Sequence, residues 1–152
     1  MSIKTQGTNL FFIDSAAVVT MQCPTGITGL GGTRDQIETT CLNATDDKAY
    51  VSGLGNPGQV SVPFVFDPSA ASHQTLLELH DSGDVTSFAI GFSDGTAVPT
   101  ITSGEMVFAS TRTYAQFDAF VADVAIDVAT NEVVRGTLTL QRSGTVAWSF
   151  KA

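Results

Sequence analysis

Hydrophobic and polar residues alternate with a period of two over much of the chain. The clearest case is the segment 60–66, where one side carries only apolar residues, namely Val60, Val62, Phe64 and Phe66. This period is typical of a strand with one buried face. Pro63 has no N–H to donate to a neighbouring strand, so we expect this strand at the edge of its sheet, or bulged at that residue.

Further apolar or alternating segments predict further strands. They cover residues 10–13, 17–23, 35–42, 87–92, 105–120, 123–128, 133–142 and 146–150, with a bend or break expected near Gln116. Turn signals such as Asp94-Gly95 separate them. No internal repeat or linker divides residues 1–152, so we expect a single, mainly β domain. Its predicted architecture is a β-sandwich or part-closed barrel with one flanking α-helix.

The single convincing helix is predicted over residues 68–81. Asp67 can cap it, Pro68 suits its first turn, and Ser82-Gly83 ends it. The residues expected on its packing side are His73, Leu76, Leu77 and His80, with the two histidines at the rim.

A polar, glycine-rich excursion over residues 43–59 separates two predicted strands. It is longer than most connections in a compact domain, and such long loops are usually functional or disordered. We therefore interpret residues 43–59 as a loop that becomes ordered by binding to something, and other copies of the chain are the first candidates.

Composition narrows the function. Charged residues make up only 14% of the chain, below the roughly 25% typical of soluble domains, which suggests a surface covered by partners. The formal charge of −8 argues against tight nucleic-acid binding, which needs a cationic patch. The N-terminal residues lack the apolar core of a signal peptide, and no segment reaches membrane-spanning length. Cys23 and Cys41 have no metal-like spacing, and we expect buried or half-buried free thiols.

Candidate catalytic and metal sites are weak. His73 and His80 lie seven residues apart and lack a third ligand, while Asp46-Asp47 and Asp81 with Asp84 lack the alternating oxygen ligands of a calcium loop. The carboxylates of Asp118, Asp123 and Asp127 suggest a glycosidase pair, but no sugar-stacking aromatic platform accompanies them, since Trp148 is expected in the core. Residues 29–32 are glycine-rich without the Lys and helix of a phosphate loop. We expect a protein that is not an enzyme and has no catalytic, cofactor-binding or metal site.

The order of these segments resembles that of the major tail tube proteins of long-tailed, siphovirus-like bacteriophages. The motifs behind the resemblance are a glycine turn with a Thr-rich strand, two short segments in the excursion, the Leu-Leu-Glu-Leu helix and a strand ending in Gln-Arg-Ser-Gly. They lie at residues 31–42, 50–54, 56–58, 76–79 and 135–144. The similarity covers nearly the whole chain, and its motifs are structural rather than catalytic.

This resemblance implies a tail tube fold, which is shared with type VI secretion tube subunits. It implies a structural virion protein that forms hexameric rings, which stack into a hollow tube for DNA delivery to the host. The implied partners are other copies of the chain, the tape measure protein, and the tail tip and terminator proteins. Double-stranded DNA would pass through without specific binding. The protein would assemble in the bacterial host cytoplasm and reside in the virion tail, without a membrane.

Two sets of residues are candidates for these roles. The resemblance places the ring-stacking contact in the excursion, at Asp46, Asp47, Lys48, Tyr50, Leu54, Asn56 and Pro57. An acidic lumen would repel DNA over about 8 Å at physiological salt, and its candidate residues are Asp118, Asp123, Asp127 and Glu132.

Other functions remain open at this stage. One is another tail component of the same fold, such as a terminator or a hub ring, and a non-phage secretion tube is a related possibility. The other is a β-sandwich module that binds carbohydrate or a receptor. Such a module needs exposed aromatic side chains, for which Tyr50 and Tyr114 are the candidates.

Overall fold

A computed structural model describes residues 2–152. Five strands precede helix α1 (Ala71–Ser82), namely β1 (Asn9–Asp14), β2 (Ala17–Thr20), β3 (Thr33–Glu38), β4 (Tyr50–Asn56) and β5 (Gln59–Val65). Five strands follow it, namely β6 (Thr86–Gly91), β7 (Thr100–Thr102), β8 (Glu105–Val107), β9 (Tyr114–Asp127) and β10 (Arg135–Ser149). The predicted mainly β fold with one helix is confirmed. Across the part of the chain described, no helix is long and apolar enough to cross a membrane.

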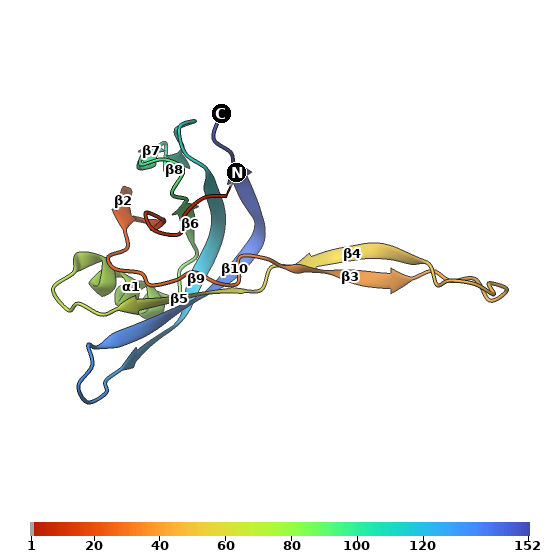
Figure 1. The fold of residues 1–152 in the computed structure, drawn as a ribbon, viewed down its shortest axis with the longest axis horizontal. Coiled ribbons are helices and arrows are strands. Elements are labelled where there is room, and N and C mark those ends of the chain that lie inside the picture. The colour runs from red at the N-terminus through yellow and green to blue at the C-terminus, as the bar shows by residue number, and fades with distance from the viewer. Residues whose placement is uncertain (1) are drawn as a thin grey trace.

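Six strands form one antiparallel sheet in the order β2-β1-β6-β9-β10-β5. This sheet curves around α1, and the paired strands β3 and β4 project far out of the body (Figure 1). Strands β7 and β8 form a second small hairpin. We call the projecting hairpin, residues 33–56, the arm.

The sheet is buried on both faces around β1 and β6. Leu10 and Phe12 join the main core, which includes Leu76 of α1, whereas Phe11 lies on the opposite face with Tyr114. Burial on both faces explains why β1 is a continuous apolar run instead of an alternating one. Further along the sheet only the α1 side is closed, and alternation returns in β5 and β10.

Strand β5 occupies an edge of the sheet, as Pro63 predicted. The chain segment before the arm runs alongside this edge. Thr25 N–H donates to the Pro63 carbonyl at 2.8 Å, and Thr28 and Ser61 exchange two backbone hydrogen bonds of 2.9 Å. The edge is therefore partly covered by the segment that leads into the arm.

Several predicted strand limits are wrong. The segment 108–113 breaks the expected strand 105–120, and β9 continues through Gln116 to Asp127. Near Gln116 the strand does not end, but its pairing with β10 is irregular between Gln116 and Asp118. Strand β10 likewise continues through Ser143-Gly144, with a register irregularity between Ser143 and Ala147. Irregularities in strand register thus stand where the sequence predicted gaps at residues 121–122 and 143–145, because pairing of β9 with β10 continues across both.

The helix also differs from its prediction. It starts at Ala71 rather than at Pro68, and its N-cap is Ala70. Asp67 instead closes a turn before the helix, accepting hydrogen bonds from the N–H and hydroxyl of Ser69 at 2.9 and 2.6 Å. At the other end, Gly83 adopts φ of 71°, and its N–H donates to the Leu79 carbonyl.

The two histidines occupy unlike positions, so the expected common side is corrected. His73 is buried in the core, between the rings of Phe64 and Phe66, with centroid distances of 4.8 and 5.9 Å. Its Nδ1 accepts from Asp67 N–H, and its Nε2 lies 2.7 Å from the Gln22 carbonyl. His80 and Leu77 are exposed. The prediction of buried or half-buried cysteines is also wrong, because Cys23 and Cys41 are both exposed.

Candidate functional site

The arm contributes no residue to either hydrophobic core cluster. All six residues of β3 are exposed, and so is every residue of β4 except Gly53. The two strands pair only with each other, so their outer edges present unpaired backbone groups. Such a hairpin is a surface on which another chain can bind.

The arm also exposes apolar side chains that a solvated hairpin does not need. Ile37 and Val51 are directly opposite each other across the strands and are 55% and 53% exposed. Tyr50, Leu54 and Leu42 are exposed as well, Leu42 completely. Tyr50 and Val51 are neighbours in one strand and face opposite sides, so both faces of the arm expose apolar side chains. Exposed apolar surface of this kind marks an interaction site.

A buried arginine fixes the base of the arm. Arg142, on β10, donates through Nη1 to the Leu30 carbonyl at 2.8 Å and through Nη2 to the Pro57 carbonyl. Leu30 precedes β3 and Pro57 follows β4, so one guanidinium ties together the two chain segments that enter and leave the arm. Burial lowers the pKa of Arg142 from its ordinary value.

Gly32 makes this close crossing possible. A Cβ at this position would lie 2.7 Å from the Asn56 carbonyl oxygen and 3.1 Å from Arg142 Nη2. The glycine turn identified in the sequence is therefore required by the approach of β10 and of the returning strand to the arm's first residues.

The predicted stacking residues lie along the returning half of the arm. Asp46, Asp47 and Lys48 are exposed at its tip, while Tyr50, Leu54 and Asn56 belong to β4. Pro57 is half-buried at the base, where Arg142 binds its carbonyl. The expectation of a loop over 43–59 is corrected in part, since residues 50–56 form a strand.

The tip itself is held by backbone pairing beyond the two strands. Thr39 N–H donates to the Ala49 carbonyl at 2.8 Å, and Ala49 N–H donates to Thr40 Oγ1 at 2.9 Å. Ala44 N–H donates to the Cys41 carbonyl at 3.0 Å. The turn at the tip therefore continues the hairpin rather than folding back onto the body.

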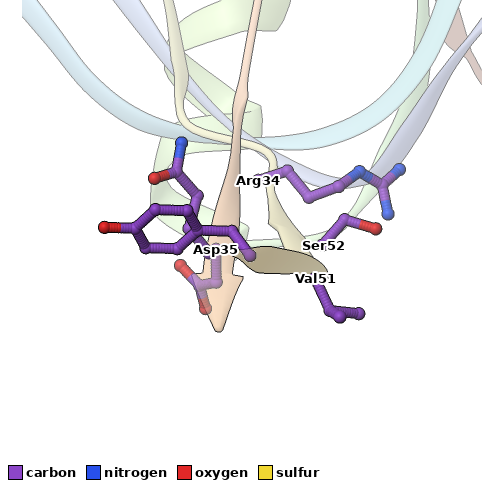
Figure 2. A pocket seen from close by; sticks show the side chains of 6 residues that line it. Arg34, Asp35, Val51 and Ser52 are labelled. Carbon is purple, nitrogen blue, oxygen red and sulfur yellow. The ribbon is translucent and has the colours of Figure 1, made fainter. Parts of the chain in front are cut away.

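A shallow depression of about 290 Å³ runs along the arm. Four of its lining side chains are labelled in Figure 2, where Arg34 and Asp35 leave β3 in opposite directions. Its lining combines Arg34, Asp35, Gln36, Tyr50, Val51 and Ser52, which supply no nucleophile with an adjacent base. The depression suits contact with a protein surface rather than chemistry.

Three of the four predicted lumen acids share one face of the sheet. Asp118, Asp123 and Asp127 are opposite Ser143, Thr139 and Arg135 of β10, on the face away from α1. Simple alternation would put Asp118 on the other face from Asp123. A register shift at Ala122 restores the common face, because Leu140 pairs with Val121 and Thr139 with Asp123. Glu132 lies apart from them, in the turn between β9 and β10.

The aromatic candidates are partly corrected. Tyr114 is fully buried, its hydroxyl donates to the Ala97 carbonyl at 2.6 Å, and burial raises its pKa. Trp148, expected in the core, is 47% exposed and stacks on Phe92 and Phe150 with centroid distances of 5.9 Å. Tyr50 is exposed on the arm, as a binding role requires.

Neither metal candidate gains support. Throughout residues 2–152, no three His, Cys, Asp or Glu side chains gather closely enough to hold a metal ion. His73 uses both ring nitrogens within the core, and His80 lies 3.7 Å from its neighbour Asp81.

Ile37, Val51, Arg34 and Arg142 lie in the motifs identified in the sequence, but no site role was predicted for them. Arg142 could have been found, because it has the same parity as Leu138 and Leu140 on the buried face of one strand. An arginine at a core-facing position of an alternating strand indicates a buried structural guanidinium. No comparable pattern distinguishes Ile37 and Val51, which look like ordinary strand residues.

Comparisons with known proteins agree on one family. The family model described as phage tail tube, TTP, lambda-like, matches residues 1–152. Structural protein 3 of Pseudomonas phage PAJU2 is 38% identical over 149 residues, which cover 93% of this chain and 90% of that protein.

Solved structures show the same fold at low identity. The SPP1 tail tube has a TM-score of 0.70 at 12% identity, covering 98% of this chain and 80% of that one. The tail of an empty GTA particle has a TM-score of 0.69 at 15% identity, covering 99% and 100%. The sheath/tube terminator of the PVC contractile injection system has a TM-score of 0.70 at 12% identity, covering 97% and 96%. The family match over the whole chain means that this protein belongs to the lambda-like phage tail tube family, as a structural component of the virion tail and not an enzyme.

Proposed function

We propose that the chain assembles into rings of six, that the rings stack into the tail tube, and that the arm makes the contact between rings. The observation that carries the proposal is the arm: two strands with open edges and an exposed Ile37–Val51 pair that find no cover in the monomer. The GTA tail of similar fold was determined with C6 symmetry, which supports a ring of six.

Physical constraints favour contact between unlike surfaces. A tube needs one contact that closes into a ring and another that propagates along the axis. The arm projects from one side of the body (Figure 1), so it meets a different surface on a neighbour and such a contact propagates. Arg142 and Gly32 fix the base from which the arm extends, which gives the contact a defined direction.

The acidic face of β9 and β10 supports a role at the lumen. Duplex DNA carries one negative charge per about 1.7 Å of axis. A surface with Asp118, Asp123 and Asp127 therefore repels DNA and does not bind it. We assign these three carboxylates to the lumen, and leave Glu132 out because it lies in the turn beyond the sheet face.

The remaining partners follow from the same assembly. A tube of controlled length needs a tape measure protein inside it, a tail tip to start it and a terminator to end it. A terminator of the PVC system has a similar fold. This supports the proposal that a ring of terminator subunits can stack on the end ring of the tube. We propose that this chain contacts such proteins through the same axial surfaces.

Replacement of arm residues 37–51 with a short Gly-Ser turn tests the proposal. The body should remain folded, because the arm adds nothing to either core cluster. Negative-stain electron microscopy over a rising concentration series, with and without purified tail tips, should show hollow rods for the unmodified chain and none for the arm variant.

A matched control is replacement of the β7–β8 turn residues Ser103 and Gly104 with two other turn residues, which alters an exposed hairpin elsewhere. This control should still form tubes. Tubes of normal diameter from the arm variant would show that rings stack without the arm.

A further inference from the structure

A groove of about 620 Å³ lies at the base of the arm, where residues 30–34 and 55–57 meet residues 144–148 of β10. Its apolar lining includes Leu30, Val146 and Trp148, and the indole of Trp148 is 47% exposed. The groove thus exposes apolar side chains to solvent at the base of the arm.

The groove is positively charged in an acidic protein. Two arginines, Arg34 and Arg142, line it, and its lining residues include no acid, although the chain has a formal charge of −8. Arg142 is committed to the Leu30 and Pro57 carbonyls. Arg34 makes one hydrogen bond within residues 2–152, from Nη1 to the Gly53 carbonyl at 3.3 Å, so its remaining N–H groups are available to a ligand. An acidic and partly apolar segment is the matching partner.

The tip of the arm has this chemistry. Leu42 is fully exposed in the turn at residues 41–44, and Asp46 and Asp47 are exposed further along the tip, followed by Lys48. The tip cannot reach the groove of its own chain, because β3 and β4 hold it away from the base (Figure 1). A contact between the two features therefore joins different copies.

The geometry points to the groove as the receptor for the arm tip of a second copy, with Leu42 against Val146 and Trp148 and the Asp46-Asp47 pair facing Arg34. This inference rests on the proposed arm-mediated stacking and names the surface that receives the arm. The two surfaces are unlike, so each copy offers one tip and one groove, and the contact repeats from copy to copy. Charge complementarity of this kind sets the register and selects the partner.

Cross-linking through the native Cys41, next to Leu42 in the tip, tests the contact. The variant Cys23→Ser/Thr145→Cys leaves one thiol at the tip and one on the groove wall, and its tubes are treated with a short bis-maleimide. We expect a ladder of covalent dimers, trimers and higher species on a denaturing gel. Tubes of Cys23→Ser alone and of Cys23→Ser/Cys41→Ser/Thr145→Cys should give no ladder.

A competing occupant of the groove is the β9–β10 turn, which carries exposed Val133 beside Glu132. The variant Cys23→Ser/Cys41→Ser/Val133→Cys/Thr145→Cys tests it, and a ladder from this protein without one from the Cys41 variant would overturn the inference. Normal tubes without any Cys41 ladder would also overturn it while leaving arm-mediated stacking intact. A failure of the unmodified protein to form tubes, even on tail tips, would contradict the proposed function and this inference together.

Charge reversal provides a second readout. Arg34→Glu and Asp46→Lys/Asp47→Lys should each raise the protein concentration needed for tubes by about tenfold, and the combined variant should recover most of that loss. Additive losses without recovery would show that the two groups do not meet.

Discussion

At the scale of single residues, the molecule depends on two buried arginines that face no carboxylate. Arg112 is 1% exposed, and five oxygen atoms lie 2.7–2.9 Å from its guanidinium nitrogens. Four are backbone carbonyls and the fifth is Asn9 Oδ1. The rings of Phe11 and Tyr114 lie 5.6 and 5.7 Å from its central carbon. Arg112 thereby joins the N-terminal segment to residues 91–97.

Arg112→Lys should lower the free energy of unfolding by at least about 2 kcal/mol, because an ammonium cannot reach carbonyls arranged around a planar fork and leaves several buried acceptors unpaired. Urea unfolding followed by tryptophan fluorescence measures the loss. Arg135→Lys, at an exposed position, is the control and should change stability by less than about 0.5 kcal/mol. Equal effects of the two variants would mean that the hydrogen bonds of Arg112 contribute little.

The two arginines differ in how far the sequence reveals them. Arg142 follows Leu138 and Leu140 in a clear alternation, so its burial can be predicted. Arg112 sits in residues 108–113, which form no strand, and the oxygens around it come from segments up to 105 residues away. A site assembled from distant backbone carbonyls leaves no periodic pattern in the sequence.

At the scale of elements, the arm shows which parts of a hairpin can be predicted from local sequence and which depend on strand pairing. The length and polarity of the excursion at 43–59 predict a segment that is either functional or disordered, and the structure shows an ordered strand over part of it. Strand β4 was missed because Ser52, Gly53 and Gly55 are poor strand formers, and pairing with β3 alone establishes it. The bulge at Ala122 was missed for a related reason, since register is set by partner strands.

The exposed Ile37–Val51 pair should matter for assembly and little for folding. Ile37→Ser/Val51→Ser removes two side chains that are half exposed in the monomer, so the free energy of unfolding should change by no more than about 1 kcal/mol. Tube formation, measured by sedimentation over a concentration series, should require at least about tenfold more protein because the apolar contact is lost.

Val85→Ser/Val98→Ser is the matched control, since both valines are exposed to a similar extent outside the arm. It should assemble like the unmodified protein. If both double variants assemble equally poorly, general loss of surface hydrophobicity, and not the arm, explains the result.

At the scale of the whole molecule, charge is distributed by face. The groove at the arm base carries two arginines, whereas the face of β9 and β10 away from α1 carries three aspartates and one exposed arginine, Arg135. The end of α1 adds Asp81 and Asp84 on another surface. A single net charge of −8 therefore describes several surfaces of different local charge.

Reversing the charge of the acidic face of β9 and β10 should make the tube bind DNA. In Asp118→Lys/Asp123→Lys/Asp127→Lys, tubes should still form, because these side chains point away from the core, although loss of the 3.0 Å hydrogen bond from Ser87 to Asp118 will cost some stability. Short duplex DNA should then bind assembled tubes with an affinity that falls steeply with salt, and virions with this tube should eject DNA more slowly.

Asp81→Lys/Asp84→Lys changes charge at the end of α1 and should leave ejection unaltered if that surface lies outside the lumen. Slowed ejection in the control with normal ejection in the triple variant would place the lumen on the α1 side of the sheet, whereas slowed ejection in the triple variant alone would assign it to β9 and β10.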